Sequence, residues 1–345
     1  MKKVSVIIPC YNVTNYIDHC MRSLLDQTIG FENMEVIFVN DCSTDSTLGK
    51  LLKYEAEYPE NIMVIPLEQN VKQGACRNIA TQYATGEYIN YVDADDYLVP
   101  TAFEKLYRIA RANDTDMVEY DRTIVFDHEI YPTDIKVPGK DELFEVKSLN
   151  DRKRLLLSGR IVRGCWNKFY RREFVLENKL RYAEGMFDEE CLFTMMAALT
   201  LKKYYNMKEK LYCYFQNPEG TLHNRVKDMT RRGDNAAVWY EILKETEERG
   251  LLKDIYREFE LLFVENYFLR SISFSLERGI VMEPDEIREM QKTVLEYFPD
   301  AANNPYSLSD PDIRDLFIIS TKELTENRVN ELVSMAEKIN ENISI

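Results

Sequence analysis

The chain has 345 residues, which is too long for one small module and suits two domains of roughly 100 to 200 residues each. Hydrophobic residues make up 45% and charged residues 30%, and this composition excludes a disordered or low-complexity protein. The formal net charge of −15 argues against a general nucleic-acid binder, because phosphate contacts need a basic surface. We therefore expect a soluble globular protein with no nucleic-acid partner.

The cysteines and the apolar runs bear on the location of the protein. Seven cysteines form an odd set without a C-x-x-C pair, so the sequence indicates neither a disulfide framework nor a zinc ribbon. Reduced thiols fit a cytoplasmic protein best. No run of about 18 apolar residues occurs, so any membrane contact is expected to be peripheral, at the inner face of the plasma membrane.

The first 121 residues alternate between short apolar runs and segments with helical periodicity. Helical spacing of apolar residues is found at 16–25 and again at 103–110. This alternation is typical of βαβ units and predicts an α/β fold with a mostly parallel sheet. The apolar runs expected to form strands are residues 4–8, 36–39, 62–67, 88–92 and 117–120.

The remaining chain has three segments of different character. Residues 122–150 show no periodicity and contain Pro132 and Pro138, which predicts an irregular excursion. Residues 147–181 carry eleven basic and three acidic side chains, which indicates either a surface for anionic ligands or a solvated helix face. From about 228 onward, apolar residues recur every three or four positions, so we predict domains at 1–227 and 228–345, the second one helical.

An acidic cluster follows the apolar run 88–92. Asp93, Ala94, Asp95 and Asp96 stand where the strand ends, and ligands of open α/β sheets bind at that end. Alternation along the strand places Asp93 and Asp95 on one face, so two carboxylates can bind one magnesium or manganese ion that also holds diphosphate oxygens. The alternative is an acidic turn in which Asp96 caps the next helix.

Two further polar turns follow predicted strands. Asp41 lies after the run 36–39 and can accept hydrogen bonds from a base or a ribose, while one of the next residues caps a helix. Residues 74–78 begin another helix and offer backbone N–H groups and the Arg77 guanidinium to a phosphate. Neither G-x-G-x-x-G nor a P-loop motif occurs, so no dinucleotide fold or P-loop is indicated.

Taken in order, these motifs resemble family 2 glycosyltransferases of the GT-A fold, of the type that makes bacterial polysaccharides. The resemblance rests on the segment 4–12, on the turn 40–45 with Cys42 where glycine is usual, and on the D-x-D at 93–95. Residues 165–172 resemble the W-x-K-L-Y segment of such members. The resemblance implies a Rossmann-like nucleotide-sugar-binding domain followed by the helical C-terminal domain.

The resemblance also implies site residues. It assigns Glu190 as the catalytic base, where aspartate is usual, preceded by Glu189; the alternative is an exposed acidic helix start, favoured there by the helix dipole. It implies a Mn²⁺ or Mg²⁺ ion with Asp95 as principal ligand, together with Asp93 and His223. The expected nucleotide-sugar contacts are Pro9, Tyr11, Asn12, Asp41, Arg77, Asp93, Ala94 and Asp95.

The function implied is metal-dependent, inverting transfer of a sugar from a UDP-sugar to a glycan or lipid-linked acceptor in cell-surface polysaccharide synthesis. The basic stretch 147–181 predicts either an anionic acceptor or a lipid-pyrophosphate carrier. A nucleotidyltransferase acting on sugar phosphates and a non-catalytic nucleotide-sugar-binding or scaffold protein are the alternatives. For the helical tail, three roles stay open: covering the acceptor site, forming an oligomer, or docking on a membrane.

Overall fold

A computed structural model describes residues 2–126, 136–159, 164–217, 234–272, 284–307 and 325–331. The chain divides into two compact units. The first comprises Met1–Asp151, Ile161–Gly185 and Glu189–His223, and the second comprises Arg152–Arg160, Met186–Asp188 and Asn224–Ile345. The boundary that we predict between residues 227 and 228 lies outside the described residues.

The first unit contains a sheet whose order, in the described part of the chain, is β3-β2-β1-β4-β8-β6-β9-β5, with β7 paired to β9. The strands β1 to β4 pair in parallel, which confirms the predicted α/β class. Strand β8 runs antiparallel to both β4 and β6, and β9 runs parallel to β6. The strands are β1 Val4–Cys10, β2 Met34–Asn40, β3 Ile62–Pro66, β4 Tyr88–Tyr91, β5 Tyr97–Leu98, β6 Met117–Val125, β7 Glu142–Glu145, β8 Lys168–Arg171 and β9 Lys203–Phe215.

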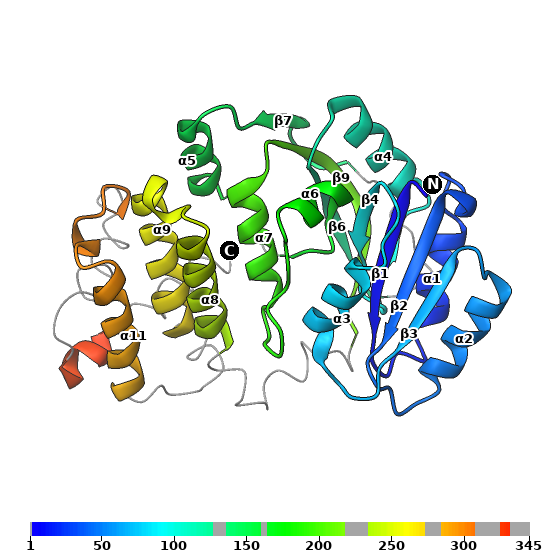
Figure 1. Ribbon diagram of the computed structural model, residues 1–345, viewed down its shortest axis with the longest axis horizontal. Helices are drawn as coiled ribbons and strands as arrows, with labels where there is room; N and C mark the ends of the chain where they lie inside the picture. The colour runs from blue at the N-terminus through cyan, green and yellow to red at the C-terminus, as the bar shows by residue number, and fades with distance from the viewer. Residues whose placement is uncertain are drawn as a thin grey trace. The chain divides into compact units, whose positions relative to one another are not determined.

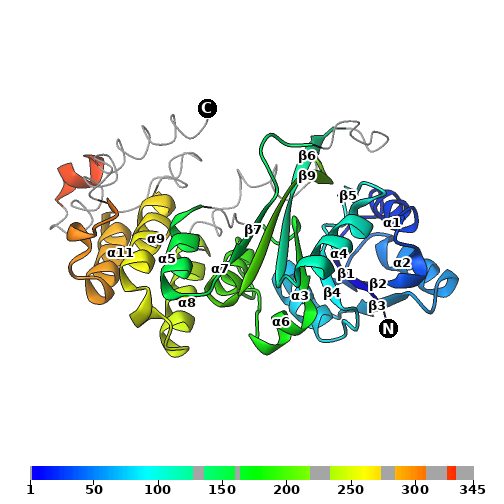
Figure 2. The same cartoon turned by 90° about the horizontal axis from the view of Figure 1, so that it is seen from above.

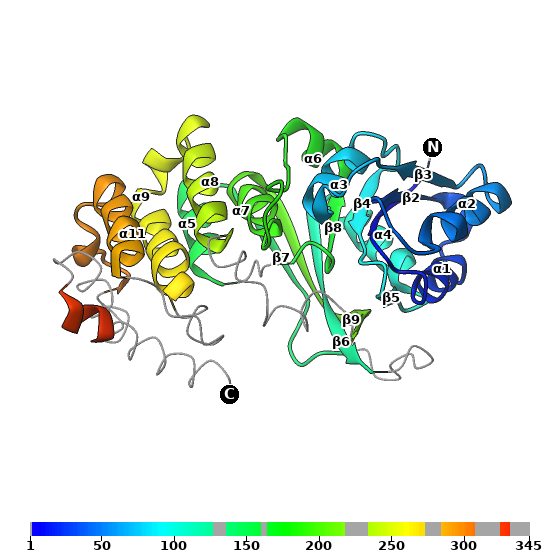
Figure 3. The ribbon, with the colours of Figure 1, turned by 90° about the horizontal axis from the view of Figure 1, so that it is seen from below.

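Helices cover both faces of this sheet. Helices α1, α2 and α4 lie on one face, and α3 and α6 lie on the other (Figures 2 and 3). Consecutive residues of β1, such as Val6 and Ile7, are therefore fully buried, as expected for a parallel strand covered on both sides. The helices of the first unit are α1 Ile17–Leu25, α2 Thr47–Glu57, α3 Lys72–Thr81, α4 Ala102–Asn113, α6 Arg172–Glu177 and α7 Glu190–Thr200; α5 Leu149–Leu157 begins in this unit and continues into the second.

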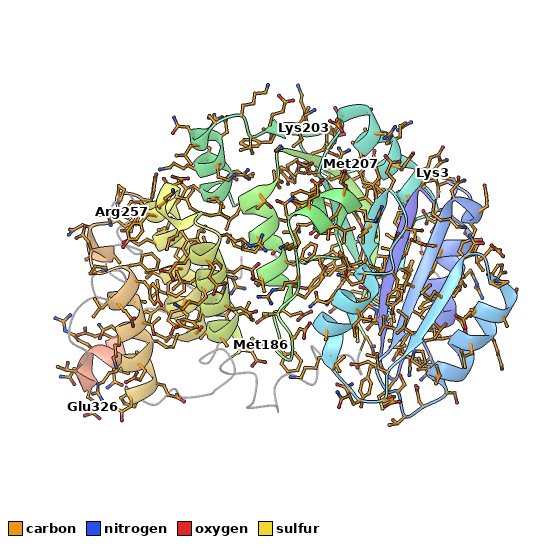
Figure 4. All side chains as sticks on the ribbon, viewed as in Figure 1. Lys3, Met186, Lys203, Met207, Arg257 and Glu326 are labelled. Carbon is orange, nitrogen blue, oxygen red and sulfur yellow. The ribbon has the colours of Figure 1, made fainter. Side chains whose placement is uncertain are left out.

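The strand directions define two edges of the sheet. Lys3 directly precedes β1 and Lys203 begins β9, and both side chains lie at the top of the view in Figure 4. That edge is the amino edge of the parallel strands. Strands β1, β2 and β4 end at the opposite, carboxyl edge (Figure 1), so the turns that follow them lie close together there.

The second unit is helical, as predicted. Its described elements include α8 Asp234–Glu248, α9 Tyr256–Phe263, the π-helix η5 Val264–Leu269 and α11 Pro284–Tyr297. Phe259, Phe263 and Phe298 are fully buried and pack against one another. Among the residues that the structure describes, no helix combines the length and the apolar sequence needed to cross a bilayer.

The predicted irregular excursion at 122–150 is wrong in part. Strand β6 continues to Val125, β7 forms within this segment, and α5 begins at Leu149. Strand β6 continues because β9 pairs with it in parallel as far as Val125 and Phe215, a partner 90 residues away in the sequence.

All seven cysteines are free thiols, in line with the predicted reduced state.

Candidate active site

The turns after β1 and β2 are joined by hydrogen bonds. The Asn12 N–H donates to Ser43 Oγ at 3.1 Å, and Asn12 Oδ1 accepts the Thr44 N–H at 2.8 Å. Asn12 and Cys42 have φ angles of 53° and 57°, in the left-handed region that favours glycine. This backbone conformation explains why glycine is usual at position 42. Asn12, expected to contact the ligand, thus holds the two turns together.

Asp41 anchors the loop that leads into α3. Its side chain is 3% exposed; Oδ1 accepts the Val71 N–H at 2.7 Å and Oδ2 accepts the Lys72 N–H at 2.9 Å. The Asp41 N–H donates to the Cys10 carbonyl at 2.8 Å, so the ends of β1 and β2 meet here. Tyr11, which follows β1, is 50% exposed and lies at the same edge as Asp41.

Three carboxylates gather after β4. Asp95 Oδ2 accepts from Asn217 Nδ2 at 2.9 Å, and Asp96 Oδ1 accepts the Phe215 N–H at 2.8 Å. The next helix, α4, has Thr101 at its N-cap position, so Asp96 is not the helix cap considered as an alternative. Burial raises the pKa of Asp96 well above its ordinary value, and the charges of Asp95 and Asp93 act in the same direction. Asp93, Asp95 and Asp96 therefore form one electrostatically coupled cluster.

Arg77 connects this cluster to the start of α7. Its Nη2 donates to Asp93 Oδ1 at 2.7 Å and its Nη1 donates to Glu189 Oε1 at 2.6 Å. Arg77 is 2% exposed and Glu189 is 1% exposed, so this is a buried, charge-assisted bridge. The guanidinium that we expected near a phosphate is thus engaged by two carboxylates.

Helix α3 holds the segment that precedes α7. Asn78 Nδ2 donates to the Tyr182 carbonyl at 3.0 Å, and Lys72 Nζ donates to the Gly185 carbonyl at 2.6 Å. A Cβ at Gly74 would lie 2.5 Å from the Ala183 carbonyl oxygen and 2.9 Å from Glu189 Cγ, so the close approach requires glycine. The sequence motif contains Gly74 and Asn78, but their partners follow about a hundred residues later.

Glu189 and Glu190 have different surroundings. Glu189 Oε1 accepts from Arg77 Nη1, and Oε2 accepts from Gln73 Nε2 at 3.2 Å; burial raises the pKa of Glu189. Glu190 is the first residue of α7 and is half-buried, at a helix end whose dipole favours a carboxylate. The Glu189 carboxylate is therefore held by two hydrogen bonds, whereas the Glu190 carboxylate is partly accessible to solvent.

The turn at Cys165 lies near the carboxylate cluster. Burial raises the pKa of the Cys165 thiol to about 12; Arg77 opposes this shift, and the charges of Glu190 and Asp93 add to it. The Trp166 ring centroid lies 4.8 Å from that of Tyr212, whose hydroxyl accepts the Asp93 N–H at 3.1 Å. Cys165 and its neighbour Trp166 therefore lie near the carboxylates after β4.

The carboxylates after β4 fit a hard cation. Asp93 and Asp95 can supply oxygen donors, and a cation would relieve the repulsion between their negative charges. Within the described ranges, no three His, Cys, Asp or Glu side chains form a complete metal site. Mg²⁺ is commonly held by one or two carboxylates and completed by substrate phosphates, so this donor set suits such an ion. His223 lies outside the described residues.

Several basic side chains of the stretch 147–181 are bound to carboxylates or carbonyls within the protein. Arg171 Nη2 donates to Asp114 Oδ1 at 2.7 Å, and Arg172 Nε donates to the Gly86 carbonyl at 3.0 Å. Arg171 pairs with Tyr88 at the beginning of β4, which is the amino edge. Lys168 is fully buried. Arg171 and Arg172 thus lie at the edge opposite the carboxylates and do not form the anion-binding surface that we predicted near the acceptor.

Comparisons with known proteins identify the family of this chain. The sequence profile described as Glycosyl transferase family 2 matches residues 5–177. The uncharacterized glycosyltransferase YibD of Escherichia coli is 29% identical over 304 residues, covering 86% of this chain and 84% of YibD. TarS of Staphylococcus aureus, a poly(ribitol-phosphate) beta-N-acetylglucosaminyltransferase, is 28% identical over 82% of this chain, which spans 46% of its length.

Solved structures share the fold. The crystal structure of TarS residues 1–349 in complex with UDP-GlcNAc has a TM-score of 0.72 at 22% identity, covering 99% of this chain and 92% of that one. The mannosyltransferase PcManGT of Pyrobaculum calidifontis, in complex with GDP-Man and Mn²⁺, has a TM-score of 0.50 at 13% identity, covering 93% and 87%. At these identities the likeness establishes the GT-A type of fold.

Proposed function

We propose that this chain, which belongs to glycosyl transferase family 2 and is therefore a glycosyltransferase, transfers a sugar from a UDP-sugar with inversion at the anomeric carbon. The acceptor in this proposal is a glycan or a lipid-linked glycan of the bacterial cell surface. The complex of TarS with UDP-GlcNAc supports the donor class, and the polymer named for TarS supports the acceptor class. Family membership decides against the nucleotidyltransferase and the non-catalytic scaffold.

The observation that carries the proposal is the Arg77 bridge. By binding Asp93 and Glu189 at once, Arg77 brings the donor-side carboxylates and the start of α7 into one centre. Glu190, the proposed base, is the residue next to Glu189. A transferase needs a leaving-group site and a base close together, and this bridge supports that arrangement.

The donor side of the site comprises the ends of β1, β2 and β4. Asp41 accepts one backbone N–H on each oxygen, and the Cys76 thiol also donates to this carboxylate; a remaining lone pair is the proposed acceptor for a nucleobase or ribose. The half-exposed ring of Tyr11 provides an apolar surface beside it. Pro9, Asn12 and Ala94 are the other proposed contacts of the nucleotide-sugar in these segments.

Asp95 is the proposed principal ligand of a Mn²⁺ or Mg²⁺ ion, with Asp93 beside it and His223 as a further candidate ligand. When bound, such an ion neutralises the charge that develops on a diphosphate leaving group. Asn217 donates to Asp95 at 2.9 Å and orients its carboxylate. The Mn²⁺ bound to the distantly similar mannosyltransferase supports a metal of this kind.

Glu190 is the proposed general base. Its carboxylate takes the proton of an acceptor hydroxyl, and the hydroxyl oxygen attacks the anomeric carbon opposite the departing UDP, whose bond to that carbon breaks. Glu189 is instead a positioning residue, because Arg77 and Gln73 occupy its two oxygens. A cytoplasmic site, at the inner face of the plasma membrane, completes the proposal.

The test compares Glu190→Gln with the unmodified enzyme. UDP release from UDP-glucose, UDP-galactose and UDP-GlcNAc is measured with Mn²⁺ and a cell-wall acceptor fraction. Loss of the base should lower turnover at least about a hundredfold, with UDP binding unchanged. If Glu190→Gln is unimpaired while Asp188→Asn is inactive, the base lies at Asp188 and the assignment is wrong.

A further inference from the structure

A row of aromatic and basic side chains lies on one face of β6 and β9, beside the carboxylate cluster. Arg122 and Ile124 of β6 stand opposite Tyr212 and Tyr214 of β9 in the paired strands. Side chains alternate between faces along a strand, and opposite residues share a face. Arg122, Ile124, Tyr212 and Tyr214 therefore belong to the same face.

Trp166 stacks on this face. Its ring centroid is 4.8 Å from that of Tyr212 and 5.6 Å from that of Tyr214, with interplanar angles of 38° and 35°. The Arg122 guanidinium carbon lies 5.2 Å from the Trp166 centroid and 5.7 Å from the Tyr214 centroid. Trp166, Tyr214 and Arg122 are called the Trp166 platform below. Trp166 and Tyr214 are partly exposed, and Arg122 is exposed.

The Trp166 platform lies next to the carboxylate cluster after β4. The hydroxyl of Tyr212, on which Trp166 stacks, accepts the Asp93 N–H at 3.1 Å. A ligand on the platform would thus lie next to the donor-side carboxylates.

The charge on the Trp166 platform is positive and accessible. Among the described residues, no carboxylate forms an ion pair with Arg122, in contrast to Arg77, Arg111 and Arg171. A guanidinium stacked on aromatic rings directs its N–H donors outward in the plane of the group. That geometry suits bidentate binding of a phosphate or carboxylate.

We propose that the Trp166 platform binds the acceptor and that this acceptor is an anionic glycan. Its sugar rings stack on Trp166 and Tyr214, and its phosphate or carboxylate pairs with Arg122. Aromatic rings suit the apolar faces of sugars, and the Arg122 charge selects the anionic polymer over a neutral one. The inference rests on the proposed glycosyl transfer, and it assigns the anionic acceptor to β6 and β9 in place of the basic stretch 147–181.

The test uses the fluorescence of Trp166. The chain has two tryptophans, and Trp239 is buried in α8, so Trp239→Phe leaves Trp166 as the single reporter. The full chain with UDP and Mn²⁺ is titrated with a ribitol-phosphate oligomer, tetragalacturonic acid and neutral cellotetraose. Both anionic probes should quench or shift the emission, and Arg122→Gln should weaken their binding about tenfold or more.

Arg111→Gln is the matched control for Arg122→Gln. Arg111 is also an exposed arginine, at 57%, but it pairs with Glu87 at the amino edge of the sheet. This variant should bind the anionic probes as the parent does. Equal loss in both variants would show a non-specific charge effect and overturn the proposal.

Thermal stabilisation by UDP keeps the two proposals distinguishable. In a protein that UDP stabilises, absence of an emission change with both anionic probes overturns the acceptor site and leaves the donor site intact. Equal binding of cellotetraose, unaffected by Arg122→Gln, overturns the anionic acceptor. Anionic binding that depends on Arg122 in a protein without UDP stabilisation supports the Trp166 platform and contradicts the UDP-sugar donor.

Discussion

Consecutive glutamates at 189 and 190 show how surroundings assign different roles to the same side chain. Glu189 is buried and held by Arg77 and Gln73, whereas Glu190 is half-buried at the first turn of α7. A buried charge is tolerated only when it is paired, and a base must reach its substrate. The assignment of Glu190 as base and Glu189 as positioning residue follows from this difference.

The stability of the two variants should differ accordingly. Glu189→Gln removes a charge that faces the buried Arg77 and should lower the free energy of unfolding by about 2 to 4 kcal/mol. Glu190→Gln should change it by less than about 0.5 kcal/mol, because the side chain is partly solvated. Urea unfolding at pH 7 measures both. Equal losses in the two variants would contradict the separation of roles.

The sequence predicted which residues belong to the candidate site, but it did not predict the side chains that they contact. Asp41, Arg77, Asp93 and Asp95 were expected at the site, and the structure places them at the carboxyl edge. Their contacts were not predictable, because Arg77 and Glu189 are 112 residues apart and Asn217 and Asp95 are 122 residues apart. Contacts at such separations leave no periodicity in the sequence. The ligand roles of these residues stay predictions.

Among the elements, α3 is central because it lies against the sheet on one side and fixes the start of α7 on the other. Gly74 permits this contact, since any Cβ there would collide with the Ala183 carbonyl and the Glu189 side chain. The precision of the site thus depends on the packing of two helices as well as on its charged groups.

A pair of glycine substitutions tests this dependence. Gly74→Ala should destabilise the fold by about 1 to 3 kcal/mol and lower turnover, because α3 and the start of α7 must separate. Gly49 lies within α2 with nothing near its Cβ position, so Gly49→Ala should stabilise the fold by about 0.5 to 1 kcal/mol and leave turnover unchanged. Thermal unfolding and UDP release measure the two effects. Unaltered turnover in Gly74→Ala would show that the contact is dispensable.

Glu209 of β9 ties α4 to the sheet and makes stability depend on pH. Burial alone would raise the pKa of Glu209, but hydrogen bonds and charge from Lys105 and Lys136 lower it below its ordinary value. A carboxylate with a lowered folded-state pKa contributes stability above its unfolded pKa, near 4.3, and loses it as pH falls through the folded value.

Glu209→Gln should therefore be less stable than the parent by about 1 to 2 kcal/mol at pH 7. The difference should shrink as pH falls from about 5 to 3, where the parent carboxylate becomes protonated. Urea unfolding at several pH values measures this difference. A difference that stays constant over that range would show that charge at Glu209 contributes nothing to stability.

Strands and helices were predicted correctly where the sequence itself shows an apolar pattern. They were missed where a strand forms by pairing with a segment that is distant in the sequence. The apolar runs at 4–8, 36–39, 62–67 and 88–92 became β1 to β4. Strands β8 and β9 were not predicted, because they carry several lysines and arginines among their apolar residues. They form because β4 and β6 supply backbone partners, which the sequence of a strand does not reveal.

For the whole molecule, the positions and partners of the charged side chains determine what a surface can bind, and the net charge alone does not. The net charge of −15 excluded general nucleic-acid binding, but the local basic excess at 147–181 suggested a free positive surface. In the structure, Arg171 and Lys168 of this stretch pair with nearby carboxylates instead. Net charge over a window counts side chains without their partners, so it does not show which of these charges are available to a ligand.

In the proposed donor site, the turns at the carboxyl edge bind a UDP-sugar through Asp41 and a metal ion at Asp95. Thermal unfolding of the full chain with UDP, GDP, CDP or ATP, each with and without Mn²⁺, measures this binding. UDP with Mn²⁺ should stabilise the fold, by about 2.7 kcal/mol at a hundredfold excess over Kd. Asp95→Asn should lose this effect while unfolding at its usual temperature without ligand. Stabilisation by ATP instead of UDP, or UDP stabilisation that needs neither Mn²⁺ nor Asp95, would contradict the account.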